Sequence, residues 1–271
     1  MSSNDGATTG PSSEWVTTLA GLGGFHEVAA PPPLGSDAVP WREVLADEAL
    51  SSRFATVRAA LATSTGLPVE EVDPKVAVSA TQVGLASRLW SVTLASTVLH
   101  RWVPDLSSDN LVTSPVHRGT VALGVVDPTS GYAASHLPDA LARICAWVVE
   151  DSLALLDHTC ARVGRTPARV LASNTASSLV GAARVLARQR PEAGAAAWEL
   201  ARALLALPQI ATGGGIREPN SLPAGIGGPM ETRDEAFLRS GCCVFYRLPG
   251  HGLCPDCVIA ERSPEQVTPG H

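Results

Sequence analysis

The sequence predicts a mainly α-helical protein with a small antiparallel β-hairpin or sheet, an α+β fold, followed by a C-terminal cysteine-rich module. Three observations predict this organisation. Apolar residues recur at helical spacing through most of 41–206, two β-rich runs interrupt them, and four of the six cysteines fall within sixteen residues near the C-terminus. The 271 residues, 45% of them hydrophobic, are enough to bury a core in one large domain, with or without a small appendage.

The composition excludes several classes of protein. A formal net charge of −6 argues against a general nucleic-acid binder, whose surface is normally basic. No transmembrane segment is expected, because charged residues interrupt even the most apolar region, 140–163. The N-terminus has no basic stretch followed by an apolar one, so no signal peptide is expected and a cytoplasmic location follows. In that reducing environment, clustered cysteines indicate metal or redox chemistry more than structural disulfides.

Residues 1–40 are expected to form a largely disordered or extended N-terminal segment. Its first part is rich in Ser, Gly, Thr and Asn, and three consecutive prolines follow at 31–33. Organised structure is expected to begin near Trp41. From there, apolar residues at helical spacing predict one helix up to Thr65 and a second over 76–102.

The next part of the chain predicts a β-hairpin and then further helices. The runs LVTSPV and TVALGVV, between Leu111 and Val126, flank a turn near Gly119. Helical spacing returns beyond Pro138 and predicts three more helices, which are 138–167, 172–190 and 192–206. The stretch 41–210 is therefore predicted to form the mainly helical domain.

Residues 211–232 are rich in Gly and Pro and are predicted to be a linker. The glycines at 213–215 do not indicate a phosphate loop, because no Lys-Ser/Thr pair follows them and no strand clearly precedes them. A short helix over roughly 233–240 is then expected to lead the chain into the cysteine module, residues 233–263.

The module spaces its four cysteines as C-C-x10-C-x2-C: Cys242, Cys243, Cys254 and Cys257. The two-residue gap of the second pair lets a tight turn direct both sulfurs at one point, as in zinc ribbons and iron–sulfur ferredoxins. The adjacent pair is more discriminating, since neighbouring side chains of an extended chain point to opposite sides. Both sulfurs can reach one centre only if the backbone bends between them, and Gly241 would ease that bend. A two-iron cluster spreads its ligands over two metals and so tolerates this pair better than a single tetrahedral zinc.

Two other interpretations of the cysteines stay open at this point, a zinc site and a reversible disulfide within either pair. Pro255 and Asp256 suit the turn between the second pair of cysteines. The remaining two cysteines, Cys145 and Cys160, lie on apolar faces of predicted helices and are expected to be ordinary core residues.

The module resembles the C-terminal [2Fe–2S] signature of the FhuF-like ferric-siderophore reductases, which has the same C-C-x10-C-x2-C spacing. The residues around the adjacent pair agree with the family's small and basic residues before it and its aromatic-Arg-hydrophobic-Pro-Gly run after it: Arg239, Ser240, Tyr246, Arg247, Leu248, Pro249, Gly250 and Gly252. The resemblance implies a [2Fe–2S] cofactor with the four cysteines as its metal ligands. In the helical domain, Arg88, Leu89 and Asn174 look similar to family positions.

What the resemblance implies is a cytoplasmic enzyme that reduces Fe(III) bound to a siderophore, of the hydroxamate type, to Fe(II). Hard oxygen donors hold Fe(II) less tightly than Fe(III), so reduction releases the iron. The electrons must come from a separate donor protein, such as a ferredoxin or an NAD(P)H-dependent reductase, because the chain has no GxGxxG nucleotide fingerprint. No catalytic residue is expected beyond the cluster.

Three residues of the module are candidates for tuning the cluster or for an electron-transfer surface: Arg239, Arg247 and His251. Nearby cations raise the potential of an anionic cluster, and Arg262 is a further candidate of this kind. His251 could couple reduction to proton uptake or replace a cysteine as ligand. Two other functions stay open, a [2Fe–2S] electron carrier or regulatory protein without chelate reduction, and an interaction module stapled by structural zinc.

Overall fold

The computed structural model describes residues 14–29, 38–114, 120–217 and 236–261. Helices make up most of these residues, and the strands are short. The helices are α1 (Glu14–Ala20), α2 (Trp41–Val44), α3 (Asp47–Thr65), α4 (Pro74–His100), α5 (Leu137–Ile144), α6 (Ala154–Val163), α7 (Ala168–Gln189), α8 (Gly194–Leu205) and α9 (Pro208–Ala211), with a π-helical stretch, Cys145–Leu153, joining α5 to α6. The strands are β1 (Val39–Pro40), β2 (Trp102–Pro104), β3 (Leu111–Thr113), β4 (Leu123–Val125), β5 (Gly131–Ala133), β6 (Gly214–Ile216) and β7 (Phe237–Arg239). The predicted fold class, mainly helical with small antiparallel sheets, is confirmed.

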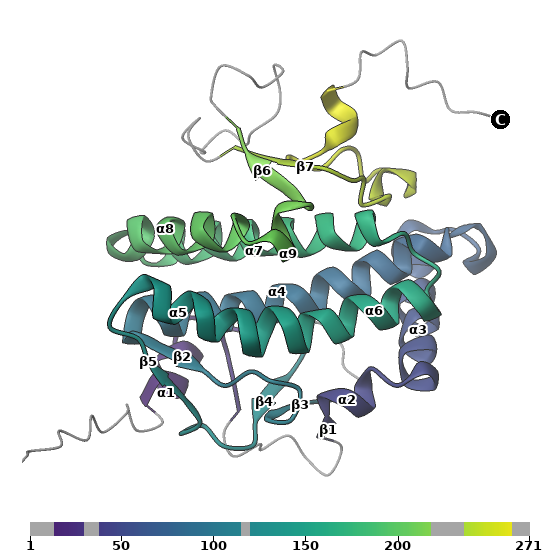
Figure 1. The fold of residues 1–271 in the computed structure, drawn as a ribbon. Helices are drawn as coiled ribbons and strands as arrows, with labels where there is room; N and C mark the ends of the chain where they lie inside the picture. The colour runs from purple at the N-terminus through teal and green to yellow at the C-terminus, as the bar shows by residue number, and fades with distance from the viewer. Residues whose placement is uncertain (1–13, 30–37, 115–119, 218–235, 262–271) are drawn as a thin grey trace, which may run out of the picture.

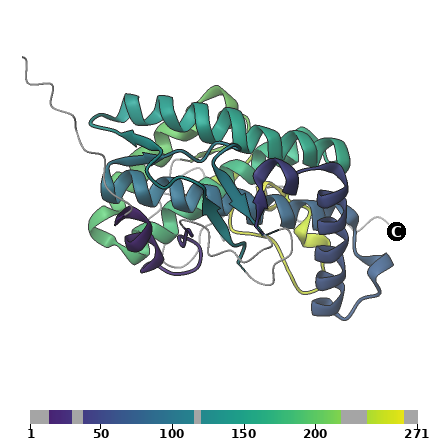
Figure 2. The same ribbon diagram turned by 90° about the horizontal axis from the view of Figure 1, so that it is seen from below.

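The helices lie in two layers, with α7 and α8 above α4, α5 and α6 (Figure 1). The short strands β1 to β5 lie on the side of the lower layer that faces away from the C-terminal segment (Figures 1 and 2). They form two antiparallel sheets, β1-β3-β4 and β2-β5. The remaining sheet, β6-β7, lies on the outer side of α7. The module that carries the cysteines therefore rests on the upper layer.

Helix α4 is the long central helix of the larger core. It begins where the Asp73 side chain accepts a hydrogen bond from the backbone N–H of Lys75 at 2.9 Å, with Pro74 as its first residue. It ends at His100, because the next residue, Arg101, has a left-handed φ of 52°. Trp102 therefore belongs to β2 and not to the helix predicted over 76–102. None of the helices in the described part of the chain combines the length and continuous apolarity needed to cross a bilayer.

The predicted hairpin between Leu111 and Val126 is confirmed. Strand β3 pairs antiparallel with β4, with Leu111 opposite Val125, and all six strand residues are buried. Its turn, residues 115–119, lies outside the described residues.

Organised structure begins earlier than Trp41, so that prediction is wrong. Helix α1 places Trp15 and Leu19 on one face, one turn apart, and both are fully buried in the larger core. The indole N–H of Trp15 also donates to the backbone oxygen of Pro128 at 3.0 Å. The other parts of the N-terminal segment on which the expectation of disorder falls, 1–13 and 30–37, lie outside the described residues.

The helix expected over 233–240 is also wrong, because its described part is strand β7. Residues 236–239 are buried in succession, as in a strand covered on both faces, and so short an apolar run cannot be distinguished from a helix by periodicity. Its partner β6 lies inside the predicted linker. Gly214 of β6 has a φ of 145°, and a Cβ there would lie 2.3 Å from the backbone oxygen of Leu238, so the close pairing requires glycine. Residues 218–235 lie outside the described residues.

Candidate metal centre

Helix α7 provides the surface on which the cysteine module rests. The Ser173 hydroxyl donates to the backbone oxygen of Gly241 at 3.0 Å and accepts from its N–H at 3.1 Å. A Cβ on residue 241 would lie 2.8 Å from the backbone oxygen of Arg169, so glycine is what allows this close approach. Gly241 was expected to ease a bend within the cysteine pair, whereas the structure uses it to bring the chain onto α7.

The backbone turns immediately after the adjacent cysteines, at Val244, whose φ of 61° is left-handed. The turn directs two successive backbone N–H groups at sulfur atoms. The N–H of Val244 donates to Cys242 Sγ at 3.2 Å, and that of Phe245 bonds to the side chain of Cys243. Backbone N–H donors favour the thiolate over the thiol, so this turn prepares both sulfurs for an electropositive ligand.

All four cysteines of the module are free thiols whose side chains interact with one another. The pKa of Cys243 lies well below its usual range, because the thiols of Cys242 and then Cys254 donate hydrogen bonds to its sulfur, and burial opposes this only in part. The pKa values of Cys242 and Cys254 are raised, first of all because each shares its proton with Cys243. Cys254 also bonds to Cys257. The four side chains thus form one continuous group.

Arg239 lies between this group and α7. Its guanidinium is buried and its Nη1 donates to Oδ1 of Asn174 at 2.6 Å. Its positive charge contributes to the lowered pKa of Cys243 and offsets part of the rise in the pKa of Cys254. Of the three candidates for tuning, Arg239 is thus the residue whose charge acts on the thiols.

The donor set fits an anionic, thiolate-bound group. The Nε of Arg239 and the Nδ2 of Asn174 are buried N–H donors with no acceptor among the described residues, and an anionic group beside them would satisfy both. The thiols contact one another pairwise. Among the described residues, no group of three or more His, Cys, Asp or Glu side chains is placed as a metal-ion site.

Asp256 fixes the turn between the second pair of cysteines to α7. Its side chain is only 9% exposed and accepts from the Ser177 hydroxyl at 2.8 Å and from Nη1 of Arg184 at 2.9 Å. Its backbone oxygen accepts from the N–H of Arg239 at 3.0 Å. One residue therefore joins the C-x2-C turn to both α7 and β7.

The loop between the two cysteine pairs contacts the start of α4. Val244 and Leu248 pack in a second, smaller core with Val72 and Val76, which precede and begin α4. Arg247 forms an ion pair with Asp73, the N-cap of α4. The module is thus held at two places, by α7 under its cysteines and by the start of α4 beside its loop.

The other residues proposed for tuning lie elsewhere. The charge of Arg247 is directed at Asp73, so its clearest role is to hold the loop. His251 is exposed and lies against Phe245, with 5.1 Å between the ring centroids. Arg262 lies outside the described residues. Cys160 is fully buried in the larger core and Cys145 packs against it, in agreement with their expected role.

Sequence reasoning missed most of the residues that support the module. Ser173, Ser177 and Arg184 were not singled out, and Asp256 was considered only as a turn residue. A signal was present, because α7 carries Ser173, Asn174 and Ser177 among residues that are otherwise apolar and buried. Polar residues four apart on a buried helix face indicate that a polar partner covers that face.

Comparison with known proteins agrees with this geometry. The fold and the site define a mainly helical protein with a C-terminal module that carries four cysteines. Residues 239–258 match the family model described as the FhuF 2Fe-2S C-terminal domain, and the match spans the cysteine module alone. No curated protein matches the chain. The chain therefore carries an FhuF-type C-terminal domain, and the cofactor of this domain is a [2Fe–2S] cluster.

Proposed function

We propose that Cys242, Cys243, Cys254 and Cys257 hold the cluster and that the protein reduces Fe(III) in a siderophore, of the hydroxamate type, to Fe(II). The observation that carries the proposal is the continuous group of four thiols beside Arg239, within the segment that matches the FhuF domain. The division into a helical domain, 41–210, and a cluster module, 233–263, belongs to the same proposal. We infer a cytoplasmic location because all six cysteines are free thiols.

When bound, the cluster supplies one-electron transfer. Each Fe(III) gains one electron, no covalent bond of the chelating molecule breaks, and the Fe(II) formed is held less tightly by hard oxygen donors. The electron comes from a separate donor protein, such as a ferredoxin or an NAD(P)H-dependent reductase. The chain's own residues supply charge and position: Arg239 and the N–H groups of Val244 and Phe245 stabilise negative charge on the sulfurs.

The surface of the module suits an approach by other molecules. Tyr246 and Leu253, which lie in the loop between the cysteine pairs, are 39% and 47% exposed. Large apolar side chains exposed beside a redox centre favour transient contact with an electron donor. The buried side of the module is occupied by α7, so exchange of electrons takes place at the loop side.

The test is an anaerobic titration of the purified full chain. Its visible spectrum and its iron and zinc contents are recorded, the protein is reduced, and ferric tris(acetohydroxamate) is added together with a chromogenic Fe(II) chelator. We expect about two irons per chain, a coloured oxidised protein, and reoxidation that keeps pace with Fe(II) formation. Cys254→Ser is expected to lose most of the cluster, whereas Cys145→Ser, the matched control, keeps it.

Each other outcome selects a different function. A coloured protein that does not reoxidise with the ferric chelate would contradict the reductase and leave an electron carrier or a regulatory protein. A colourless protein with stoichiometric zinc would contradict the cluster, because Zn(II) has no visible d–d transitions. Full cluster occupancy in Cys254→Ser would contradict the ligand assignment.

A further inference from the structure

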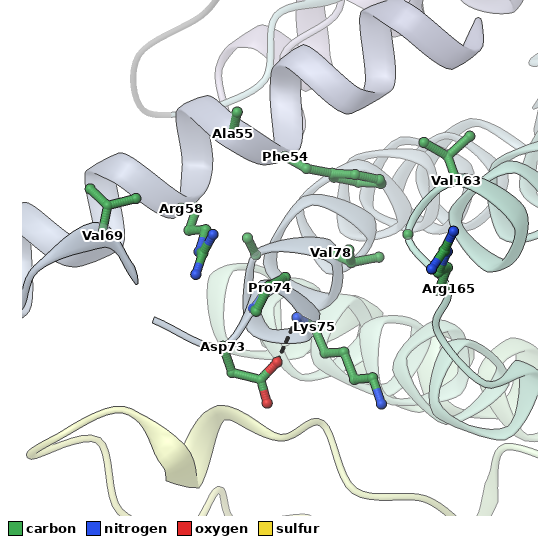
Figure 3. A pocket seen from close by; sticks show the side chains of 12 residues that line it. Phe54, Ala55, Arg58, Val69, Asp73, Pro74, Lys75, Val78, Val163 and Arg165 are labelled. Atoms are coloured by element: carbon green, nitrogen blue, oxygen red, sulfur yellow. Dashed lines mark hydrogen bonds between the residues drawn. The ribbon is translucent and has the colours of Figure 1, made fainter. Parts of the chain in front are cut away.

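A cavity of about 470 Å³ opens beside the cysteine module. It lies between α3, the turn Val69–Glu71, the start of α4 and the end of α6, and Figure 3 shows the side chains around it. Its volume is in the range of small-molecule binding sites. Among its lining residues, Asp73 contacts the cysteine module through Arg247.

Positive charge surrounds the cavity. Lys75 and Arg165 are exposed at its edge, and neither forms an ion pair within the described part of the chain. Arg58 is already oriented, since its Nε donates to the backbone oxygen of Val72 at 2.7 Å and its Nη2 to that of Glu70 at 3.0 Å. These bonds leave Nη1 of the Arg58 guanidinium for a ligand.

The lining contains a single carboxylate, and that carboxylate is occupied. Asp73 accepts the backbone N–H of Lys75 and pairs with Arg247 of the module. Three cations therefore line a site in which the one carboxylate among the described lining residues is paired with a fourth cation, Arg247. The start of α4, a helix of 27 residues, adds the positive end of its dipole at the same place.

The wall of the cavity is apolar. Phe54 and Val78 form one part of it and Val163 another, and Val69 is exposed at the opening (Figure 3). Such a lining, with cations at its edge, suits a ligand with an apolar body and negatively charged groups.

The cavity is joined to the module by direct contacts. Asp73 connects its lining to Arg247, and the neighbouring Val72 and Val76 pack against Val244 and Leu248. In Figure 3 the side chains of Asp73 and Lys75 point towards the backbone of the C-terminal module. A ligand in the cavity would lie next to the loop between the cysteine pairs.

We propose that this cavity binds the ferric chelate and selects chelates with net negative charge, such as hydroxamates joined by a carboxylate-bearing backbone, over neutral tris(hydroxamates). The inference rests on the proposed function, because the chelate is the substrate of that reaction. The charges that carry it, on Lys75, Arg165 and Arg58, lie outside the cysteine module and are independent of the cluster ligands.

Binding is tested with gallium(III) chelates, because gallium replaces iron but is not reduced. Calorimetry on the full chain with its cluster compares the gallium chelate of a citrate-based dihydroxamate, which is anionic, with neutral gallium tris(acetohydroxamate). We expect the anionic chelate to bind at least about tenfold more tightly, the equivalent of about 1.4 kcal/mol. The difference in affinity should shrink as the salt concentration rises from about 0.05 M to about 0.5 M.

Substitutions locate the site. Lys75→Ala and Arg165→Ala are each expected to weaken binding of the anionic chelate about tenfold and to leave the neutral chelate unchanged, since each removes one charge-assisted contact. Arg188→Ala is the matched control, an exposed cation about 30 Å along α7 from its first turn. All three positions are exposed, so unchanged melting temperatures are expected.

The outcomes separate the two proposals. Charge-dependent gallium binding without reduction of the ferric chelate would contradict the reductase and support the cavity. Reduction of the ferric chelate with equal rates in wild type, Lys75→Ala and Arg165→Ala, and equal affinity for both gallium chelates, would overturn the cavity and leave the reductase in place.

Discussion

Val244 holds a left-handed backbone conformation, with a φ of 61°, although it is β-branched. This conformation costs roughly 1–2 kcal/mol for an ordinary residue. The cost is offset because the same turn directs N–H groups at Cys242 and Cys243 and places the Val244 side chain in the smaller core. Strain at one residue thus supports the arrangement of two sulfurs.

The strain predicts that, at Val244, substitution by glycine is less destabilising than substitution by alanine, the reverse of the usual order. Val244→Gly and Val244→Ala both lose the packing of the valine, but only glycine removes the cost of the left-handed backbone. We expect Val244→Gly to be more stable than Val244→Ala by about 1 kcal/mol in denaturant unfolding. At Val98, inside α4, the same pair should show the ordinary order, with alanine more stable by about 1 kcal/mol. The same order at both positions would contradict the strain.

Asp157 is a buried carboxyl that the proposed reaction does not use. Burial raises its pKa from 3.8 to about 6, although Gln82 and Thr175 donate hydrogen bonds to it. Between pH 3.8 and about pH 6, Asp157 keeps its proton in the folded protein but has lost it in the unfolded chain. The contribution of Asp157 to the free energy of unfolding therefore falls as pH rises through this range. The full shift corresponds to about 3 kcal/mol.

Asp157→Asn should therefore match the wild type near pH 4 and exceed it in stability near pH 7 by about 3 kcal/mol. Urea unfolding at both pH values measures this difference. The comparison with wild type is essential because burial also lowers the pKa of His26 to about 4. His26 therefore makes stability rise with pH over an overlapping pH range, opposite to the effect of Asp157. A difference that is constant with pH would contradict the raised pKa of Asp157.

At the scale of single residues, the sequence alone identifies the four cysteines of the module but not the residues that surround them. The C-C-x10-C-x2-C spacing is local, so it identifies the thiols without knowledge of the fold. Asp256 and Ser177 are 79 residues apart and meet only because β7 is laid along α7. The spacing of residues along the sequence cannot predict a hydrogen bond between positions so far apart.

At the scale of elements, the long helices were predictable because their apolar spacing extends over many turns. The short strands β6 and β7 were not, since three residues carry no periodicity that separates a strand from a helix. The glycines of 211–232 contribute to the prediction of a linker. At Gly214 glycine serves instead a close approach between two strands, which appears only when the partner is known.

Helix α7 acts as the support of the C-x2-C turn through Asp256, and this support can be tested. Asp256→Ala removes the carboxylate that Ser177 and Arg184 bind in a buried setting, so we expect a loss of about 3 kcal/mol. Thermal melts followed by visible absorbance should show the cluster lost at a lower temperature than in wild type. Asp109→Ala, which breaks an ion pair with Arg42 at an 82% exposed carboxylate, should cost under about 0.5 kcal/mol. Equal losses in the two variants would contradict the role of α7.

At the scale of the whole molecule, the larger hydrophobic core comes almost entirely from the helical domain, whereas the smaller core needs residues from both the helical domain and the module. The larger core is built almost entirely from residues before 211, with Phe237 as its buried contribution from the C-terminal segment. The smaller core is shared, because Ala62, Val72 and Val76 come from the helical domain and Val244 and Leu248 from the module. The helical domain can therefore bury its apolar residues alone, whereas the module cannot.

This difference predicts that the helical domain folds on its own and that the module does not. A chain ending at residue 210 should unfold cooperatively, weakened by about 2–3 kcal/mol through the loss of Phe237, as followed by circular dichroism. The polar residues of α7 that held the module, Ser173 and Ser177, would then bond to water at little cost. A peptide of residues 233–271 should show no cooperative transition and should not retain iron after reconstitution and gel filtration, since the groups that fix Gly241 and Asp256 are absent. A peptide that holds its cluster as firmly as the full chain would show that the module carries its own structure and would contradict the shared core.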